Sequence, residues 1–242
     1  MKNLEQEKLD MVLEESSILT ASLQRRSFLK YAGAGAAGIA LIAAGCKKDR
    51  GGNPMTGTTL DFKDDFGVLN YAYALEQLEA AFYIQVASNP PSTFSAAEKL
   101  YFQDIQFHEI AHREFFKKAL GPAAIGSLEV DFSSINFTDR TSVLGAAKAF
   151  EDLGVAAYNG AGVRIKTDAY LVIAGQIVSV EARHAAYVRD LISNGSFADL
   201  NDLAASGLGA DNAKGLDGAL TPDKVLGIAG KYIKTKINVI NL

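Results

Sequence analysis

Apolar residues recur every three or four positions through four long segments of the chain, as Leu75, Leu78 and Phe82 do in the first. This spacing predicts four helices, each with one face to bury against its neighbours. Capping and stop residues bound the four helices at about residues 65–87, 95–120, 139–161 and 167–194. The pattern therefore predicts an all-α fold.

The lengths of the connections predict the topology. Short turns join the first helix to the second and the third to the fourth, so each pair should form an antiparallel hairpin. The stretch between the second and third helices, residues 121–138, is long enough to run back along a bundle. We therefore expect a four-helix bundle with one long crossover. A short extra C-terminal helix, from Pro222 to about Lys231, is expected across one end of it. The last segment, residues 235–242, could be an interface strand or a capping tail.

Both predicted hairpins carry the same pattern of carboxylate and imidazole residues. The first helix of each has a Glu, and the second has Glu-x-x-His. The six residues are Glu76, Glu109, His112, Glu151, Glu181 and His184. Residues three apart share a helix face, so four helices turned inward would supply enough ligands for two metal ions. Mixed carboxylate and imidazole ligands suit iron or manganese. A tyrosine follows each single Glu at the same spacing, and Tyr83 and Tyr158 are expected beside the ligands.

Other polar residues near this pattern are interpreted from the repeat. Glu79 lies one turn beyond the first Glu, but Gly154 occupies the equivalent position of the second hairpin. The repeat therefore excludes Glu79 as a ligand and leaves it as an entry-path or exposed residue. His108 should point away from the ligands, either as their outer partner or, as we favour, as a polar residue on the bundle edge. Asp152 and Glu114 are interpreted as surface charges.

Two other interpretations of the same residues remain open. Residues 108–112, His-Glu-Ile-Ala-His, also match the H-E-x-x-H pattern of zinc metalloproteases. That interpretation leaves Glu181 and His184 unexplained. In the other alternative, the Glu and His side chains bond to one another without metal and the bundle is a structural scaffold.

The N-terminal segment, residues 1–45, has the pattern of an export signal. Residues 25–30, Arg-Arg-Ser-Phe-Leu-Lys, form a twin-arginine motif, and the apolar Ala- and Gly-rich run 31–45 follows it. That run is shorter than the roughly 20 residues that a membrane-spanning helix needs. We therefore expect residues 1–45 to be a signal peptide and the exported protein to lie in the periplasm or cell envelope.

Cys46 is the only cysteine of the chain, so no disulfide can form within it. The preceding residues 41–45 resemble a lipoprotein cleavage site, although Ala43 stands where Leu is usual. Cys46 is thus a candidate for lipidation, the alternative being a cysteine beside an ordinary cleavage site. Residues 46–60 are expected to form a flexible tether. The bundle should occupy residues 61–195, and residues 196–242 should form a C-terminal extension.

Composition excludes one class of partner. The chain of 242 residues has a net charge of −4. Its exported part contains no run rich in Lys and Arg, and a nucleic-acid-binding protein would show such a basic patch. The expected partners are therefore metal ions with oxygen or peroxide, and the membrane only through a lipid anchor. The sequence does not predict an oligomeric state.

The ligand pattern over residues 61–195 resembles the ferritin-like superfamily of di-iron carboxylate proteins, with rubrerythrin-like spacing. The run 69–83, Leu-Asn-Tyr-Ala-Tyr-Ala-Leu-Glu-Gln-Leu-Glu-Ala-Ala-Phe-Tyr, also resembles an exported bacterial subgroup sometimes called desiccation-associated. The resemblance implies that Glu109 and Glu181 bridge two iron (or manganese) ions. Glu76 and Glu151 would be terminal or bridging ligands, and each histidine would bind one ion.

The same resemblance implies redox chemistry with oxygen or peroxide, in oxidative-stress defence or iron handling. A manganese-catalase-like reaction is an alternative, and metal binding without turnover is another. The chain differs from rubrerythrins in two features. The chain lacks the cysteine motif of rubrerythrins, and Gly154 replaces their second carboxylate on the third helix.

Overall fold

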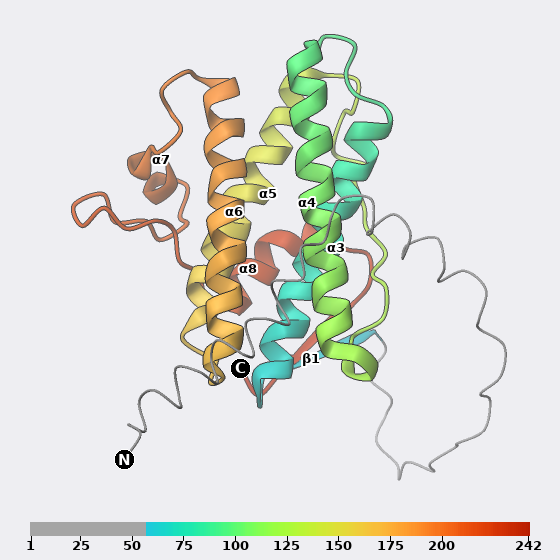
Figure 1. Ribbon diagram of the computed structural model, residues 1–242, viewed down its shortest axis with the longest axis vertical. Coiled ribbons are helices and arrows are strands. Elements are labelled where there is room, and N and C mark those ends of the chain that lie inside the picture. The colour runs from blue at the N-terminus through green and yellow to red at the C-terminus, as the bar shows by residue number, and fades with distance from the viewer. Residues whose placement is uncertain (1–56) are drawn as a thin grey trace, which may run out of the picture. The chain divides into compact units, whose positions relative to one another are not determined.

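The computed structural model describes residues 57–242, and within them it confirms the predicted bundle (Figure 1). The four long helices are α3 (Asp65–Ser88), α4 (Ala96–Leu120), α5 (Arg140–Gly162) and α6 (Asp168–Ile192). Each begins and ends within a few residues of the predicted bounds. The proposed signal peptide, Cys46 and the tether up to residue 56 lie outside the described residues. Among residues 57–242, no helix is both long and apolar enough to cross a membrane.

Side-chain caps fix where the helices begin. Ser95 and Glu98 form the predicted capping box at the start of α4, because each side chain bonds to the backbone N–H of the other residue. The Asp139 side chain accepts a hydrogen bond from the Ser142 N–H at the start of α5. The start of α6 is held from outside, since the Asp65 carboxylate accepts from the N–H groups of residues 166 and 167.

The helices pack as two antiparallel hairpins, α3 with α4 and α5 with α6, and the hairpins meet mainly along α3 and α5. The connection from α4 to α5 runs the length of the bundle (Figure 1), as its length predicted. It begins with a short 3₁₀ helix, η1 (Gly121–Ala123). Two buried amides of α3 hold it: Asn70 bonds to Ala123 O and Ile125 N, and Gln77 accepts from Leu128 N. These bonds satisfy backbone groups of the crossover that would otherwise be unpaired.

The C-terminal extension contains α7 (Leu200–Ala205), α8 (Pro222–Ala229) and the 3₁₀ helix η2 (Gly230–Tyr232). The expectation that the last helix lies across one end of the bundle is wrong, because α8 packs on α5. The Leu220 N–H bonds to Ala156 O, and the Tyr232 ring lies 4.7 Å from that of Phe150. Gly160 permits this approach, since a Cβ there would lie 1.8 Å from Leu220 O.

Two short strands tie the ends of the described chain together. β1 (Thr58–Asp61) and β2 (Ile237–Ile240) pair in parallel. The end of the expected tether is therefore a strand, and Leu60 within it is fully buried. Of the two expectations for the C-terminal segment, the strand is confirmed in part: residues 237–240 form a strand, and its partner is β1 of the same chain.

Apolar side chains fill the bundle as two clusters. The larger follows α3 and α5 along most of their length and includes Phe82, Tyr83, Phe102 and Phe150. The smaller lies towards one end of the bundle, around Phe116 and other residues of all four helices. Buried carboxylates and imidazoles occupy the middle of the four long helices.

Candidate metal centre

The six carboxylate and imidazole residues of the internal repeat meet in the core. Helices α3 and α5 each contribute a glutamate, and α4 and α6 each contribute a glutamate and a histidine. They are Glu76, Glu109, His112, Glu151, Glu181 and His184. The four glutamates have no exposed surface, and the side chain of His112 is only 12% exposed. The structure therefore brings together every residue that the sequence selected as a candidate ligand.

The six residues form two groups that share two members. In each group, the ligand atoms lie within 4.8 Å of one another. The first group is Glu76, Glu109, His112 and Glu181, and the second is Glu109, Glu151, Glu181 and His184. Because Glu109 and Glu181 belong to both groups, two ions placed in them would have two carboxylates in common.

The imidazoles face the shared carboxylates reciprocally across the bundle. Nδ1 of His112, on α4, lies 2.8 Å from Oε1 of Glu181, on α6. Nδ1 of His184, on α6, lies 3.0 Å from Oε1 of Glu109, on α4. The unshared glutamates are slightly farther: 3.5 Å from His112 Nδ1 to Glu76 Oε2, and 3.4 Å from His184 Nδ1 to Glu151 Oε2.

These close approaches leave the polar atoms without properly aligned hydrogen bonds. Nδ1 of both histidines and all four carboxylate oxygens of Glu109 and Glu181 are buried without a hydrogen-bond partner among the described residues. Buried polar atoms normally have such partners, and buried charges are costly without compensation. Atoms directed at a common centre fit a cation at that centre. Oxygen and imidazole donors of this kind suit iron or manganese.

The pKa values show how unevenly the cluster holds its protons. Burial raises the pKa of Glu76 to about 8, although the nearby His112 ring opposes the shift. Burial would also raise the pKa of Glu181, but the close approach of both imidazoles outweighs it and lowers the pKa to about 2. For His184, burial favours the neutral ring, yet the charge of Glu151 and the nearby carboxylates of Glu109 and Glu181 raise its pKa to about 12. Without a cation, therefore, these groups keep protons that a metal would displace.

The two repeat tyrosines cross between the hairpins. Tyr83, on α3, donates a hydrogen bond to Oε1 of Glu151 on α5. Tyr158, on α5, donates one to Oε1 of Glu76 on α3. The sequence placed both tyrosines beside the ligands, and the structure agrees. The sequence does not show that each tyrosine donates its hydrogen bond to the glutamate of the other hairpin.

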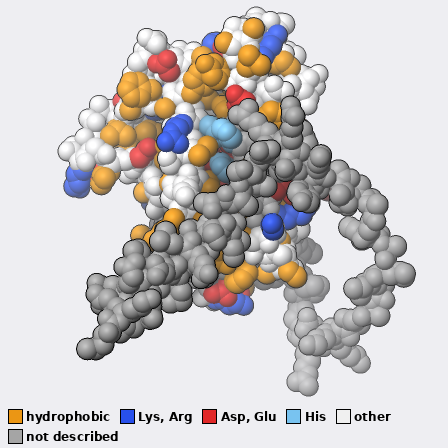
Figure 2. All heavy atoms as spheres, viewed as in Figure 1, with side chains coloured by type: hydrophobic (Ala, Val, Ile, Leu, Met, Phe, Trp, Pro, Cys, Tyr) orange, Lys and Arg blue, Asp and Glu red, His pale blue; other side chains and the backbone are white. Residues whose placement is uncertain are grey.

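His108 contacts the site from outside. Its Nδ1 lies 2.9 Å from Nε2 of His184, and the two rings stack with centroids 5.1 Å apart. Of the two interpretations of His108, these contacts favour an outer partner of the ligands over a residue that lies on the bundle edge alone. His108 is exposed, and histidine side chains reach the surface on the face that carries α4 and α6 (Figure 2). Neither group of candidate ligands contains His108, so the two histidines of the H-E-x-x-H pattern do not converge on one metal position.

Glu79 is a buried acid that the sequence did not identify as such. Only 3% of its surface is exposed, and its Oε2 has no hydrogen-bond partner among residues 57–242. Burial and the charges of the surrounding glutamates raise its pKa well above the usual range. Gly154 makes room for it, because a Cβ there would lie 2.9 Å from Glu79 Oε1. Its position one turn from Glu76 was the available signal.

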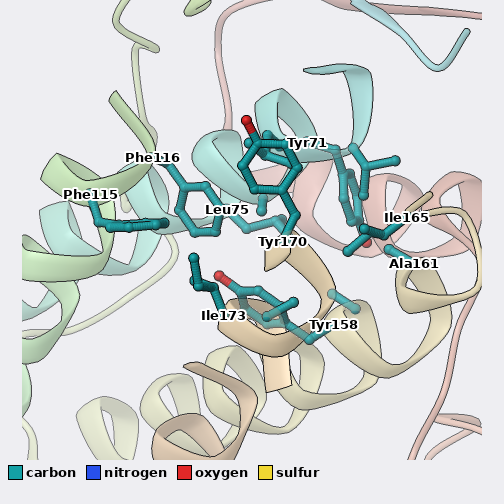
Figure 3. A pocket seen from close by; sticks show the side chains of 14 residues that line it. Tyr71, Leu75, Phe115, Phe116, Tyr158, Ala161, Ile165, Tyr170 and Ile173 are labelled. Carbon is teal, nitrogen blue, oxygen red and sulfur yellow. The ribbon is translucent and has the colours of Figure 1, made fainter. Parts of the chain in front are cut away.

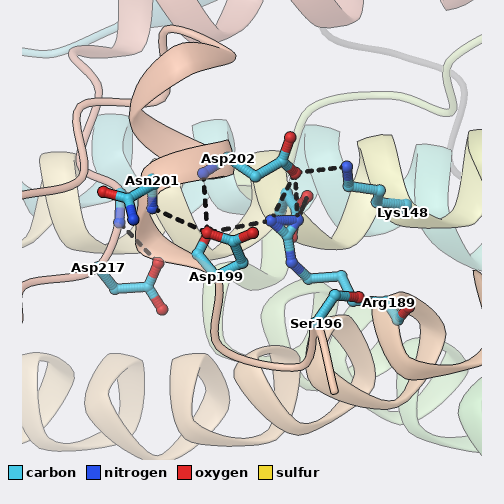
Figure 4. A network of polar contacts seen from close by, with 9 residues as sticks. Lys148, Arg189, Ser196, Asp199, Asn201, Asp202 and Asp217 are labelled. Carbon is cyan, nitrogen blue, oxygen red and sulfur yellow. Dashed lines mark hydrogen bonds and ion pairs between the residues drawn. The ribbon is translucent and has the colours of Figure 1, made fainter. Parts of the chain in front are cut away.

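Asp152 is also buried, so its interpretation as a surface charge is wrong. Its carboxylate accepts a hydrogen bond from buried Arg189 at 3.1 Å, and burial raises its pKa to about 6 in spite of that cation. Arg189 also binds Asp202, which lies between it and Lys148 (Figure 4). This network fastens α7 to α5 and α6. Glu114 is surface-exposed as expected and pairs with Arg113.

Comparison with known proteins agrees with this architecture. The family model described as a ferritin-like domain matches residues 64–194, which is more than half of the chain. The chain belongs to the ferritin-like family. The match begins at the cap of α3 and ends just after α6, so the ferritin-like domain is the four-helix bundle that holds all six candidate ligands. No curated protein matches the chain.

Proposed function

We propose that this ferritin-like protein binds two iron or manganese ions and uses them in redox chemistry with oxygen or peroxide. The observation that carries the proposal is the pair of ligand groups sharing Glu109 and Glu181. A single metal site would need only one such group. A buried cluster of this size without a cation would also leave several ionisable groups uncompensated.

Each residue has a definite part in the proposed centre. Glu109 and Glu181 would bridge the two ions, and His112 and His184 would each bind one ion through Nδ1. Iron or manganese in these positions would supply one-electron steps to an oxidant. The bridging carboxylates would move as the charge between them changes. Tyr83 and Tyr158 would hold the outer carboxylates in place through their hydroxyl groups.

The surroundings fit an exchange of electrons and protons with the outside. Exposed His108 stacks on buried His184, which joins the surface to one candidate ligand. The single cysteine, Cys46, cannot form the four-cysteine site that electron-transfer modules use, so an external donor would supply the electrons. We further propose export by the twin-arginine route, with Cys46 as the lipidation site. A role in oxidative-stress defence or iron handling follows from these proposals.

Metal analysis of ligand variants tests the proposal. Wild-type protein, purified from its own host and reloaded with Fe²⁺ without oxygen, should bind two ions per chain. Glu109→Ala combined with Glu181→Ala removes both shared ligands and should abolish uptake while the helical circular dichroism remains. Glu76→Ala removes a ligand from one group only and should reduce uptake to one tightly bound ion.

Glu114→Ala is the control, since Glu114 lies on α4 outside both groups and should leave uptake unchanged. Two ions bound by the double variant would refute the proposed site. Wild-type protein that binds a single zinc would instead favour the metalloprotease interpretation. No metal in the wild type would favour a structural scaffold.

A further inference from the structure

An apolar pocket opens at the end of the bundle where the smaller hydrophobic cluster lies. All four long helices line it, and its lining side chains are aliphatic or aromatic, with tyrosine hydroxyls as their only polar groups. Figure 3 shows the rings of Tyr158, Phe116 and Tyr170 gathered around it. The cavity volume is about 30 Å³, and the pocket is open to solvent at its mouth. The pocket therefore admits very small molecules.

The inner wall of this pocket consists of neighbours of the candidate ligands. The Tyr158 ring lines the pocket, and its hydroxyl donates to Oε1 of Glu76. Leu75, also in the wall, precedes Glu76 in the chain. Phe116 lies one helical turn beyond His112 on α4. A molecule in the pocket is thus one side chain away from the first group of ligands.

The equivalent place at the other end of the centre is filled. Tyr83, the repeat counterpart of Tyr158, has no exposed surface. Its ring packs against those of Phe82 and Phe102, with centroids 5.0 and 5.7 Å away. Tyr158 retains 8% exposure. The two halves of the centre have equivalent ligands but different surroundings, and the open pocket adjoins the Tyr158 half.

The chemistry of the wall discriminates between the two oxidants. Hydrogen peroxide carries two hydroxyl groups, and the only polar groups that the wall offers them are tyrosine hydroxyls, of which that of Tyr158 is already bonded to Glu76. Each peroxide hydroxyl that is left without a partner costs roughly 2–7 kcal/mol. Dioxygen is apolar and pays no such penalty, and a dry apolar cavity takes up small apolar molecules. The wall therefore favours dioxygen.

We propose that this pocket is the entry path and waiting site for dioxygen, which makes dioxygen rather than peroxide the oxidant of the centre. The inference rests on the proposed function and names its substrate. Peroxide, if it reacts, would reach the ligands by a polar route such as the exposed face at His108.

The first test needs no metal. Crystals of the metal-free protein are pressurised with xenon, which binds dry apolar cavities. Xenon should occupy the pocket beside Tyr158 in the wild type. It should be absent from Ala174→Leu, because Ala174 lines the pocket and the larger side chain fills it. Ala186→Leu is the matched control, because Ala186 is a partly buried alanine of the same helix that lines a different pocket. In this variant, xenon should remain in the pocket beside Tyr158.

The second test follows oxidation of the Fe²⁺-loaded protein by stopped flow, with dioxygen and hydrogen peroxide in separate experiments. Ala174→Leu should slow the reaction with dioxygen by about tenfold, which corresponds to a barrier about 1.4 kcal/mol higher. The reaction with peroxide and both reactions of Ala186→Leu should stay at the wild-type rate. If leucine prevents folding, Ala174→Val makes a smaller addition at the same place.

Three results would overturn the inference: no xenon in the wild-type pocket, an unchanged dioxygen rate in the filled variant, or equal slowing with both oxidants. Each can occur while the wild type still binds two iron ions, so it would leave the metal centre standing. Failure of the wild type to bind iron would refute the proposed function, and the oxidant assignment with it.

Discussion

Three buried tyrosines of the bundle provide an internal test of what its hydroxyl groups do. Tyr83 and Tyr158 donate hydrogen bonds to Glu151 and Glu76. The hydroxyl of Tyr71, on the same helix as Tyr83, is buried without a hydrogen-bond partner among the described residues. We therefore expect opposite effects of Tyr→Phe at these positions, although each change removes one oxygen atom from a buried ring.

The magnitude follows from what each hydroxyl leaves behind. In Tyr83→Phe and Tyr158→Phe, a fully buried carboxylate oxygen loses its donor, and a buried acceptor left unpaired costs about 1–3 kcal/mol. For a domain of this size, such a loss lowers the melting temperature by about 2–12 °C. In Tyr71→Phe, the removed hydroxyl had itself been desolvated without compensation, so the change should be neutral or stabilising.

Urea unfolding of the metal-free variants, followed by circular dichroism, measures these differences without a contribution from metal affinity. The midpoint should fall for Tyr83→Phe and Tyr158→Phe at unchanged slope, and it should hold or rise for Tyr71→Phe. Equal destabilisation by all three changes would show that ring packing, not hydrogen bonding, sets the effect. The reasoning would also be refuted if Tyr83→Phe and Tyr158→Phe each lowered the free energy of unfolding by less than about 0.5 kcal/mol, because ordinary surface substitutions have effects of that size.

Two further predictions follow from the buried acids. Because the pKa of Glu76 is raised from 4.5 to about 8, the folded metal-free protein holds this proton more tightly than the unfolded chain does. Its free energy of unfolding should fall by about 3–5 kcal/mol as the pH rises from 5 to 8, and its affinity for metal should rise over the same range. Urea unfolding at a series of pH values measures the change in stability, and an increase in stability with pH would contradict the prediction. Gly145→Ala in α5 adds a Cβ to open space and should stabilise by up to about 1 kcal/mol in thermal melts. Gly154→Ala should forfeit that gain, because its Cβ would lie 2.9 Å from Glu79 Oε1, and an equal gain at both glycines would refute the close contact.

The fold and the candidate ligands could be predicted because both depend on spacing along the chain. The three-and-four pattern fixes the four helices, and stop residues such as Pro90 and Gly121 fix their ends. A Glu-x-x-His pair places both side chains on one helix face, so the repeat identified its own inward positions. Connection lengths then determined which helices form hairpins.

The burial of other polar residues could not be predicted in the same way, because it depends on partners far away in the sequence. Asp152 is buried at a place where Arg189 of another helix reaches it. Glu79 is buried because the position opposite it, on α5, is a glycine. The contact of His108 with His184 depends on how α4 and α6 pack against each other, and the spacing of residues within one helix does not determine that packing. In each case an ordinary charged or polar residue looked like part of a solvated surface.

The internal repeat also explains why the sequence predicts the ligands better than their surroundings. Both hairpins must present equivalent ligands if two ions are to be held side by side, so the same pattern of Glu and Glu-x-x-His occurs in each hairpin. The features that differ between the two hairpins are not repeated. Glu79 of the first hairpin corresponds to Gly154 of the second, and the ring of Tyr83 is packed whereas that of Tyr158 lies beside the open pocket. A symmetric centre can hold metal, but an oxidant must enter from one side. The departures from the repeat are therefore where control over access to the proposed centre should be sought, and the variants at Ala174 and Gly154 act on two of them.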